Sequence, residues 1–432
     1  MSSASATAPR TPWYQGFLSG LQKMGRSLQV PIAVLPAAGI LNRLGQPDVF
    51  GADGLGWNNV AKVLAGAGGA LLDAGLGLPL LFCVGVAIGM AKKSDGSTAL
   101  AAVTGFLVYF AVLRQFPVGC SAGQAYTAAG LFSGVCVTPG GTTTAAAYQN
   151  PGVFGGIILG LLSAWFWQRF HRTKLVDWLG FFNGRRLVPI IMAGVAIVFA
   201  SLCVWIWPPI GDALNSFAHW MSGQGAWGAA IFGVANRALL VVGMHQFLNT
   251  FMWFQFGSYT TGGVTYTGDI PRFLHGDPTA GQFTSGFFPI MMFALPAAAL
   301  AIAHTAYPQR RKEIMGLAVS VSLTSFVTGV TEPIEYSFLY VAPLLYVIHA
   351  ILTGVSMGVT WAFGVHDGFS FSAGVIDYGL NYSLATKPLL IIPIGLVFAV
   401  LYYAIFRFAI TRFDLKTPGR EDEDVDAAIV KD

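Results

Sequence analysis

The sequence predicts an all-α, polytopic membrane protein. The chain has 432 residues, of which 54% are hydrophobic and only 10% are charged, whereas soluble proteins carry about 25% charged residues. The charges are also clustered, and none lies between Arg186 and Asp212, for example. Such intervals hold apolar runs of the roughly 20 residues that a helix needs to cross a bilayer, most clearly at 188–207 and 389–406.

Two other fold classes fit the composition poorly. A soluble protein with buried core helices cannot absorb so many long apolar runs in a chain of this length. A membrane β-barrel requires residues that alternate at period two, and these runs do not alternate. The 33 Phe and 11 Trp suit helices with aromatic belts at the two membrane interfaces.

The apolar runs predict about ten membrane helices, together with re-entrant hairpins in the second half. The stretch 58–72 is amphipathic and is expected to lie along the interface. The predicted runs are 28–41, 75–90, 100–113, 153–167, 188–207, 229–254, 283–303, 314–328, 338–351 and 389–406.

Basic clusters between the runs predict the topology. Under the positive-inside rule they mark the cytoplasmic side, which places both termini inside the cell. The clusters are Lys23/Arg26, Lys92/Lys93, Arg169–Lys174, Arg185/Arg186, Arg310–Lys312 and Arg407/Arg412. Residues 1–20 are expected to form a cytoplasmic tail without a signal peptide, and 415–432 a second, polar cytoplasmic tail.

The net charge of +4 sits in short loops and forms no basic stripe, so no nucleic-acid partner is expected. No Walker A pattern and no metal-ligand spacing occurs, and no cofactor or metal is predicted. Cys83 and Cys203 lie in apolar runs and are interpreted as packing residues. Cys120 and Cys136 flank a loop, and either pair on an oxidising face or remain structural thiols.

Two carboxylates mark a candidate substrate site. Glu332 and Glu335, in GVTEPIEYSF, lie in apolar text that Gly329 and Pro333 interrupt. A carboxylate within a membrane segment costs on the order of 3 kcal/mol, so its presence there favours a function. If a helix begins near Pro333, both side chains share one helix face. The alternative is a cytoplasmic loop with ordinary solvated acids.

A second group lies in NRALLVVGMHQFLNTFMWF. Arg237 and His245 are eight residues apart, about two helical turns, and would line one helix face. Asn236 and Asn249 add amide donors and acceptors, and several Trp and Phe residues follow. A hydroxyl-rich ligand requires this mixture of donors, acceptors and aromatic rings. A lone His in apolar text is, by itself, more often a packing residue.

Other histidines are weaker candidates. His275 lies in the polar connection GDIPRFLHGDPTAGQF and is interpreted as solvated. His366 and Asp367 follow a long apolar run and could border the same cavity. His349 lies within an apolar span and is interpreted as structural.

Four motifs in order now carry a family resemblance. NRALLVVGMH, HGDPTAG, TGVTEPIEYSF and LKTPGRED resemble the enzyme IIC subunits of the glucose superfamily of phosphotransferase-system sugar permeases, over about 21–422. GFFPIMMFALPAAALA and GFSFSAGVIDYGL are similar to the N-acetylglucosamine branch; the alternative is a glucose-specific enzyme IIC.

The resemblance implies a homodimeric, elevator-type transporter in a bacterial plasma membrane. Residues 21–225 would form a scaffold and dimerisation region, and 226–414 a substrate-binding region. Carried over by motif, Arg237, His245 and Glu332 would contact the sugar, with Glu335 as a nearby support and Glu332 as the catalytic residue. Asn236 is expected to bind the substrate through its amide group. Gln246 departs from the pattern, because relatives often have a second His there.

The resemblance also implies partners. The sugar would be phosphorylated at its 6-hydroxyl from a phosphocysteine on enzyme IIB, supplied by the upstream proteins IIA, HPr and enzyme I. None of the four cysteines here has the CITRLR-like context of that donor, so a separate enzyme IIB is expected. Two rival functions remain: an ion-coupled secondary sugar transporter, in which Glu and His relay protons, and a sugar sensor.

Overall fold

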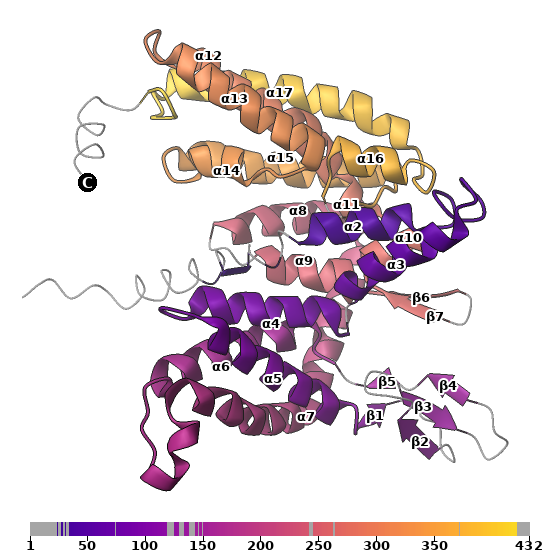
Figure 1. The fold of residues 1–432 in the computed structure, drawn as a ribbon. Coiled ribbons are helices and arrows are strands. Elements are labelled where there is room, and N and C mark those ends of the chain that lie inside the picture. Colours follow the sequence, from indigo (N-terminus) through magenta and orange to yellow (C-terminus); the bar gives the residue numbers. More distant parts are fainter. Residues whose placement is uncertain are drawn as a thin grey trace, which may run out of the picture. The chain divides into compact units, whose positions relative to one another are not determined.

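The computed structural model shows a mostly helical chain in the part that it describes (Figure 1). It describes residues 24, 27, 28, 31, 34–73, 75–118, 125–128, 134–137, 143–145, 147, 148, 150–241, 245–261, 264–370 and 372–420. Within these residues, short antiparallel strand pairs occur only in the connections between helices. The predicted all-helical membrane class therefore holds for the framework.

Six described helical segments are long and apolar enough to cross a membrane, or seven if one bent helix pair forms a single span. The six are Gly96–Leu113, Val153–Phe170, Gly184–Gly223, Gln282–Thr305, Pro343–Ala362 and Pro388–Arg412, and the bent pair is Asn58–Leu72 with Gly77–Met90. The count of about ten spans stays a prediction.

Many apolar side chains on these segments point away from the protein. Val198, Trp205 and Val400 are 61%, 82% and 70% exposed. A soluble protein rarely exposes such large contiguous apolar surfaces, whereas a lipid-facing helix does so by design. The exposed faces thus agree with the hydropathy of the spans.

The chain divides into two compact units. Unit 1 comprises the described residues of Met1–Ala33, Pro79–Trp205 and Val242–Gln246, and unit 2 those of Val34–Leu78, Ile206–Val241 and Phe247–Asp432. The expected functional regions 21–225 and 226–414 are each continuous in sequence, whereas these units are not. The functional division stays a prediction.

Unit 1 is a helical bundle with strands in one connection. Its helices are α4 (Gly77–Met90, except its first two residues), α5 (Gly96–Leu113), α6 (Val153–Phe170) and the first part of α7 (Leu187–Gly223). Its short strands are β1 (Pro117–Val118), β2 (Ala125–Ala128), β3 (Gly134–Val137), β4 (Thr143–Ala145) and β5 (Ala147–Tyr148), and the 3-10 turns η1 (Asp177–Phe182) and η2 (Gly184–Arg186) precede α7.

Glycines let the helices of unit 1 approach closely. A Cβ at Gly156 would lie 2.2 Å from the Pro79 carbonyl oxygen, and one at Gly160 would lie 2.5 Å from that of Cys83. Both glycines of α6 therefore face α4 at backbone contact distance, the small-residue packing common between membrane helices. Asp95 begins α5 with a capping box to Thr98, which satisfies the free amides of the first turn.

Unit 2 contains the first two residues of α4, the part of α7 from Ile206 onward and the remaining elements. Its helices are α2 (Leu35–Leu44), α3 (Asn58–Leu72), α8 (Ala226–Leu240), most of α9 (His245–Phe254), α10 (Asp269–Leu274), α11 (Gln282–Ser285), the π-helical turn η3 (Pro289–Ala294), α12 (Leu295–Thr305), α13 (Arg311–Thr328), α14 (Glu332–Leu339), α15 (Pro343–Ala362), α16 (Val375–Asn381), the 3-10 turn η4 (Pro388–Leu390) and α17 (Ile391–Arg412). Strands β6 (Ser258–Thr261) and β7 (Val264–Thr267) form a hairpin.

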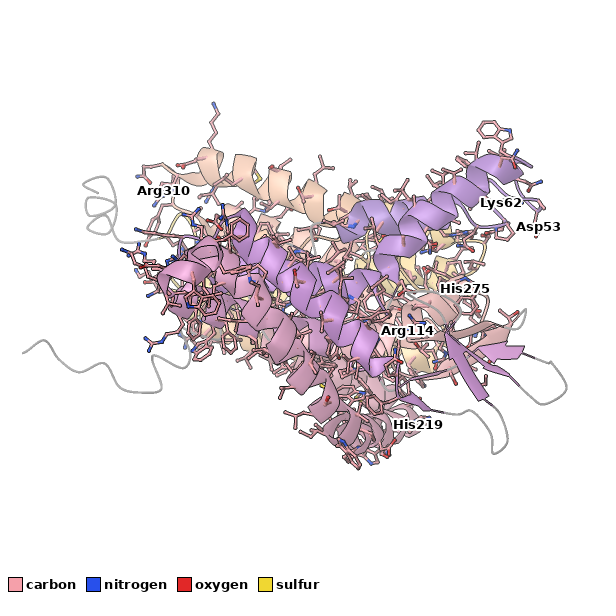
Figure 2. The ribbon with its side chains drawn as sticks, turned by 60° about the horizontal axis from the view of Figure 1, so that its bottom comes forward. Asp53, Lys62, Arg114, His219, His275 and Arg310 are labelled. Atoms are coloured by element: carbon pink, nitrogen blue, oxygen red, sulfur yellow. The ribbon has the colours of Figure 1, made fainter. Side chains whose placement is uncertain are left out.

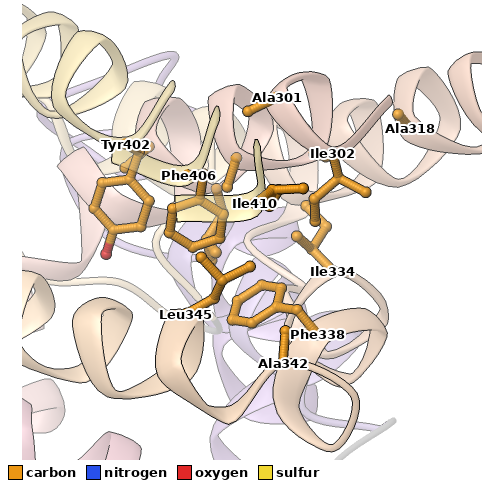
Figure 3. Close-up of a cluster of buried hydrophobic side chains, with 14 of the residues drawn as sticks. Ala301, Ile302, Ala318, Ile334, Phe338, Ala342, Leu345, Tyr402, Phe406 and Ile410 are labelled. Carbon is orange, nitrogen blue, oxygen red and sulfur yellow. The ribbon is translucent and has the colours of Figure 1, made fainter. Parts of the chain in front are cut away.

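A buried apolar cluster joins α8, the π-helical turn η3, α12, α13, α14, α15 and α17 of unit 2. Side chains of α12, α13, α14, α15 and α17 meet in it, including Ile302, Phe338, Leu345 and Phe406 (Figure 3). The rings of Phe338 and Phe406 are edge to face at 5.3 Å between centroids, a favoured aromatic geometry. This cluster fixes α14, and with it the candidate carboxylates, against α15.

Small residues also set the contact between α8 and α15. A Cβ at Gly354 would lie 2.5 Å from Val234 Cγ2 and 2.7 Å from the Ala230 carbonyl oxygen, and one at Gly233 would lie 2.9 Å from the Gly354 Cα. The two backbones can approach this closely only because both glycines lack a side chain. Arg237 on α8 is thereby held beside α15.

The opposite ends of unit 2 carry different residues. Arg310, between α12 and α13, lies at one end, and Asp53 and Lys62 lie at the other (Figure 2). Arg420 donates from Nη1 to the Thr305 carbonyl oxygen at 2.9 Å, which brings the segment after α17 to the end that holds Arg310. The predicted basic clusters 310–312 and 407–412 are therefore at one end of this unit.

Several sequence expectations need correction. The predicted run 229–254 is two helices, α8 and α9, because the helix ends at Leu240 and the next begins at His245. The predicted run 338–351 spans the break between α14 and α15, since Pro343 starts α15 at a position where its missing amide costs nothing. Cys136 is disulfide-bonded, while Cys120 lies outside the described residues.

Candidate functional site

A turn between α13 and α14 places the two carboxylates. Gly329 ends α13 in the left-handed conformation at φ 72°, which residues with a Cβ adopt at a cost. Pro333 lies in the first turn of α14, where a proline is already in helical geometry. The predicted helix near Pro333 is confirmed, so Glu332 and Glu335 lie within one turn of α14.

A buried ion pair forms the centre of the site. Arg237 of α8 donates from Nη1 to Glu335 Oε1 at 2.6 Å, across 98 residues of sequence. The two residues are 3% and 0% exposed. Removing two charges from water costs several kcal/mol each, which close pairing offsets. Each charge therefore depends on the other for its presence in the interior.

Side chains from α15 and α17 surround this pair. His349 Nε2 lies 3.3 Å from Glu335 Oε1, and its Nδ1 is 2.9 Å from Tyr402 Oη. Tyr346 donates from its hydroxyl to the backbone oxygen of Arg237 at 2.6 Å. These contacts fix the orientation of both charged groups.

One side-chain nitrogen and one side-chain oxygen of the ion pair lack hydrogen-bond partners in the described structure. Neither Arg237 Nε nor Glu335 Oε2 has a hydrogen-bond partner among the residues that the structure describes. The Arg237 guanidinium also lies over the ring of Phe287, with 5.2 Å from Cζ to the centroid, a cation–π contact. One buried donor and one buried acceptor thus remain available to a polar ligand next to an aromatic ring.

Glu332 differs from Glu335. It is partly buried at the start of α14, and within the described part of the chain it forms no ion pair. The Arg237 charge is already compensated by Glu335. Glu332 is therefore the carboxylate of the two that has no ion-pair partner among the described residues, and its catalytic role stays a prediction.

The two predicted amides meet. Asn236 of α8 donates from Nδ2 to Asn249 Oδ1 of α9, and both side chains are buried. Asn236 precedes Arg237, so this bond fixes the same stretch of α8 that carries the ion pair. The structure thus brings Asn236, Arg237 and Glu335 together in unit 2, with Glu332 on the same short helix as Glu335.

His245 does not share a helix face with Arg237. It begins α9, whereas Arg237 lies on α8, and residues 242–244 between them are outside the described part. The 3.6-residue period that motivated the pairing therefore does not extend from one to the other. The ring Nε2 of His245 is 2.9 Å from the side-chain Nε2 of Gln246. Gln246 is the position at which the sequence departs from the family motif. A role for His245 in sugar binding stays a prediction.

Sequence reasoning missed His349 and Phe287. His349 was interpreted as structural because it is a single polar residue in an apolar span. Its Nε2 lies 3.3 Å from Glu335 Oε1, so it is a polar neighbour of the ion pair, which a structural role also allows. The available signal was the cost of burying an imidazole in a membrane helix, which favours a polar partner there.

A second polar group surrounds the connection after β7. Arg272 donates from Nε to Asp277 at 2.7 Å, and Asp269 accepts from the Gly281 amide at 3.0 Å. Burial raises the pKa of Asp269 to about 6. Burial also lowers the pKa of His275, which stacks on Tyr266 at 3.5 Å between ring centroids. His275 is therefore partly buried and packed, not solvated as expected.

Comparisons with known proteins identify the family of the chain. The family model for "Phosphotransferase system, EIIC" matches residues 25–354. The chain is 62% identical over 426 residues to the N-acetylglucosamine-specific EIIC component of Streptomyces coelicolor, covering 98% of both chains. The chain belongs to the phosphotransferase-system EIIC family. As the motifs suggested, it is a membrane component of that transferase system.

More distant EIIC relatives differ in substrate and in length. The N-acetylglucosamine-specific EIICB component of Bacillus subtilis is 45% identical, over 95% of this chain and 81% of its own. The glucose-specific EIICBA component of Staphylococcus carnosus is 42% identical, over 96% of this chain and 62% of its own. Identities of 45% and 42% are too similar to distinguish a relative named for N-acetylglucosamine from one named for glucose. The relative at 62% identity is the one that differs clearly from both.

Proposed function

We propose that this EIIC chain imports N-acetylglucosamine and presents it for phosphorylation at the 6-hydroxyl. The single observation that supports this best is 62% identity, over 98% of both chains, to a relative named as N-acetylglucosamine-specific. The buried, partly unpaired ion pair beside an aromatic ring supports it independently. Hydroxyl-rich ligands require such donors and acceptors.

The phosphoryl donor in this proposal is a separate EIIB protein. The relative from Streptomyces coelicolor is named as an EIIC component alone and matches over 98% of its length. In the Bacillus subtilis relative the name EIICB covers a longer chain, of which this one matches 81%. In our proposal the donor is charged by IIA, HPr and enzyme I.

Glu332 acts as the catalytic residue in this proposal. Phosphoryl transfer is accelerated mainly by positioning and charge compensation. A carboxylate without an ion-pair partner can accept a hydrogen bond from the 6-hydroxyl and take its proton as the phosphoryl group leaves the donor sulfur. Glu332 meets that condition, because Glu335 compensates the buried arginine.

Arg237 and Glu335 bind and position the sugar. Arg237 Nε can donate to a sugar oxygen, and Glu335 Oε2 can accept from a hydroxyl. Their mutual ion pair fixes both groups before the sugar arrives, so little conformational entropy is lost on binding. Asn236 stabilises the same stretch of α8, and His245 is proposed to complete the site.

The transport step is proposed to follow an elevator mechanism in a homodimer. The region 21–225 would form the dimer scaffold, and 226–414 would move with the sugar across about ten membrane helices. Both termini would face the cytoplasm of a bacterial cell. The basic residues gathered at the Arg310 end of unit 2 support placing that end inside.

Uptake into vesicles tests the proposal. Inverted or reconstituted vesicles would receive purified EIIB, the upstream phosphotransfer proteins and phosphoenolpyruvate, with labelled N-acetylglucosamine or glucose. We expect sugar phosphate to form only with EIIB and phosphoenolpyruvate, and unlabelled N-acetylglucosamine to compete better than glucose. Accumulation of unmodified sugar driven by a proton gradient would instead indicate an ion-coupled transporter. Equal competition would indicate a glucose or broad hexose permease.

A further inference from the structure

Asp367 carries an unexplained buried carboxyl group. The residue is 0% exposed, and neither of its carboxyl oxygens has a hydrogen-bond partner among the described residues. Burying a polar group without a partner costs roughly 1–3 kcal/mol or more. Native structures leave few such groups, and an absent ligand is one physical explanation.

The backbone around Asp367 is fixed from two sides. Its amide donates to the Gly281 carbonyl oxygen at 3.2 Å, and its own carbonyl accepts from Thr284 Oγ1 at 2.9 Å. The preceding residue, His366, exchanges two backbone hydrogen bonds with Thr386, at 3.1 and 2.7 Å. The backbone position of Asp367 is therefore fixed by hydrogen bonds to two other segments of unit 2.

The carboxyl group of Asp377, whose charge acts on Asp367, already accepts hydrogen bonds from the backbone. Asp377 accepts hydrogen bonds from the backbone amides of Ser370, at 2.7 Å, and Ser372, at 3.2 Å. These bonds engage both carboxyl oxygens of Asp377, and neither of them involves Asp367. Burial, and then the Asp377 charge, raise the pKa of Asp367 well above its usual range. A neutral carboxyl group at this position offers one donor and one acceptor.

Aromatic rings connect this loop to the Arg237–Glu335 pair. Phe369 lies edge to face with Trp253, at 5.1 Å between centroids. Trp253 in turn lies edge to face with Phe287, at 6.4 Å, and Phe287 supports the Arg237 guanidinium. The indole Nε1 of Trp253 is buried and has no partner among the described residues.

We propose that Asp367 and Trp253 form a subsite that recognises the 2-acetamido group of the sugar. This rests on the proposed function and adds the residues that set its specificity. An acetamido group has one N–H donor, one carbonyl acceptor and a methyl group. Asp367 accepts from the N–H, the Trp253 indole donates to the carbonyl, and the Phe369 ring packs on the methyl group.

The subsite explains discrimination against glucose. Glucose replaces the acetamido group with a hydroxyl, which cannot reach both polar groups and fill the aromatic surface. The site would then leave a buried donor or acceptor unpaired. A site built to hydrogen-bond one group rejects analogues that lack it, because the buried partners remain unsatisfied.

Binding of two sugars to purified variants tests the subsite. Calorimetry or tryptophan quenching would measure N-acetylglucosamine and glucose on the wild type, Asp367→Leu and Trp253→Phe. We expect each variant to lose at least tenfold in affinity for N-acetylglucosamine, about 1.4 kcal/mol, with less than a threefold change for glucose. Asp367→Leu should keep or raise the thermal midpoint, because it removes an unpaired buried polar group.

Ser163→Ala is the matched control, because Ser163 is also 0% exposed and its Oγ is unpaired in the described structure. It should leave the ratio of the two affinities unchanged. Equal losses for both sugars in Asp367→Leu, or wild-type affinity for N-acetylglucosamine, would overturn the subsite. If Asp367→Leu does not fold, Trp253→Phe decides by the same ratio. A wild type without binding or EIIB-dependent phosphorylation would refute the proposed function itself.

Discussion

Glu335→Gln should strongly destabilise the protein. The substitution keeps the shape and hydrogen-bonding capacity of the side chain but removes its charge. Arg237, only 3% exposed, would then be a buried cation that has lost its 2.6 Å carboxylate partner. The loss would also remove the carboxylate 3.3 Å from His349 Nε2.

The expected magnitude follows from the burial of both partners. Breaking a buried ion pair on one side costs about 3–5 kcal/mol, because an uncompensated charge remains. Removing both charges costs much less. Arg237→Met combined with Glu335→Gln should therefore be more stable than the sum of the two single effects predicts, by on the order of 2 kcal/mol.

Unfolding in detergent, followed by tryptophan fluorescence, would measure the wild type, both single variants and the double variant. Each should also be checked for sugar binding, which both single variants and the double variant should lose. The double-mutant cycle gives the coupling free energy directly. A Glu335→Gln protein within 1 kcal/mol of wild type, or a coupling energy near zero, would refute the assignment of this pair as mutually dependent.

Three further substitutions test other parts of the structure. Glu332→Gln should lower sugar binding modestly but phosphorylation by on the order of 100-fold, the size of a general-base contribution; parallel loss of both would indicate a structural role. Gly354→Ala should cost about 1–3 kcal/mol of unfolding free energy through overpacking against Val234, whereas Gly316→Ala, with no heavy atom within 4 Å, should be neutral or slightly stabilising. Burial raises the pKa of Asp269 from 3.8 to about 6, so its stabilising contribution is full below pH 3.8 and is lost as the pH rises through about 6. Asp269→Asn should flatten that part of the stability profile in thermal unfolding, and an unchanged slope would contradict the shift.

Hydropathy predicted the helices whose ends coincide with a change from apolar to polar text. The amphipathic run 58–72 is α3 (Asn58–Leu72), and the run 314–328 ends with α13 at Thr328. Both ends are visible in the sequence because charged or glycine-rich segments adjoin them. Helices that cross a membrane are easy to recognise from hydropathy, because the bilayer requires about 20 predominantly apolar residues in a row.

Hydropathy could not locate the helix ends that lie within continuous apolar sequence. The run 229–254 reads as one helix because both α8 and α9 are largely apolar. Where a helix stops there depends on packing, such as the close approach of α8 to α15 at Gly233 and Gly354. The strands in the connections were missed for another reason, since segments of two to four residues are too short to show a periodicity.

The residue types of the site were predictable, but their pairing was not. The cost of a charge within apolar text singles out Arg237, Glu332 and Glu335 from sequence alone. That Glu335 compensates Arg237 depends on a contact across 98 residues. Had Glu332 been the partner instead, Glu335 would be the free carboxylate and the catalytic assignment would reverse. The proposed role of Glu332 therefore rests on charge pairing: the buried cation neutralises one acid of α14, and the other, at the partly exposed start of the helix, has no ion-pair partner among the described residues.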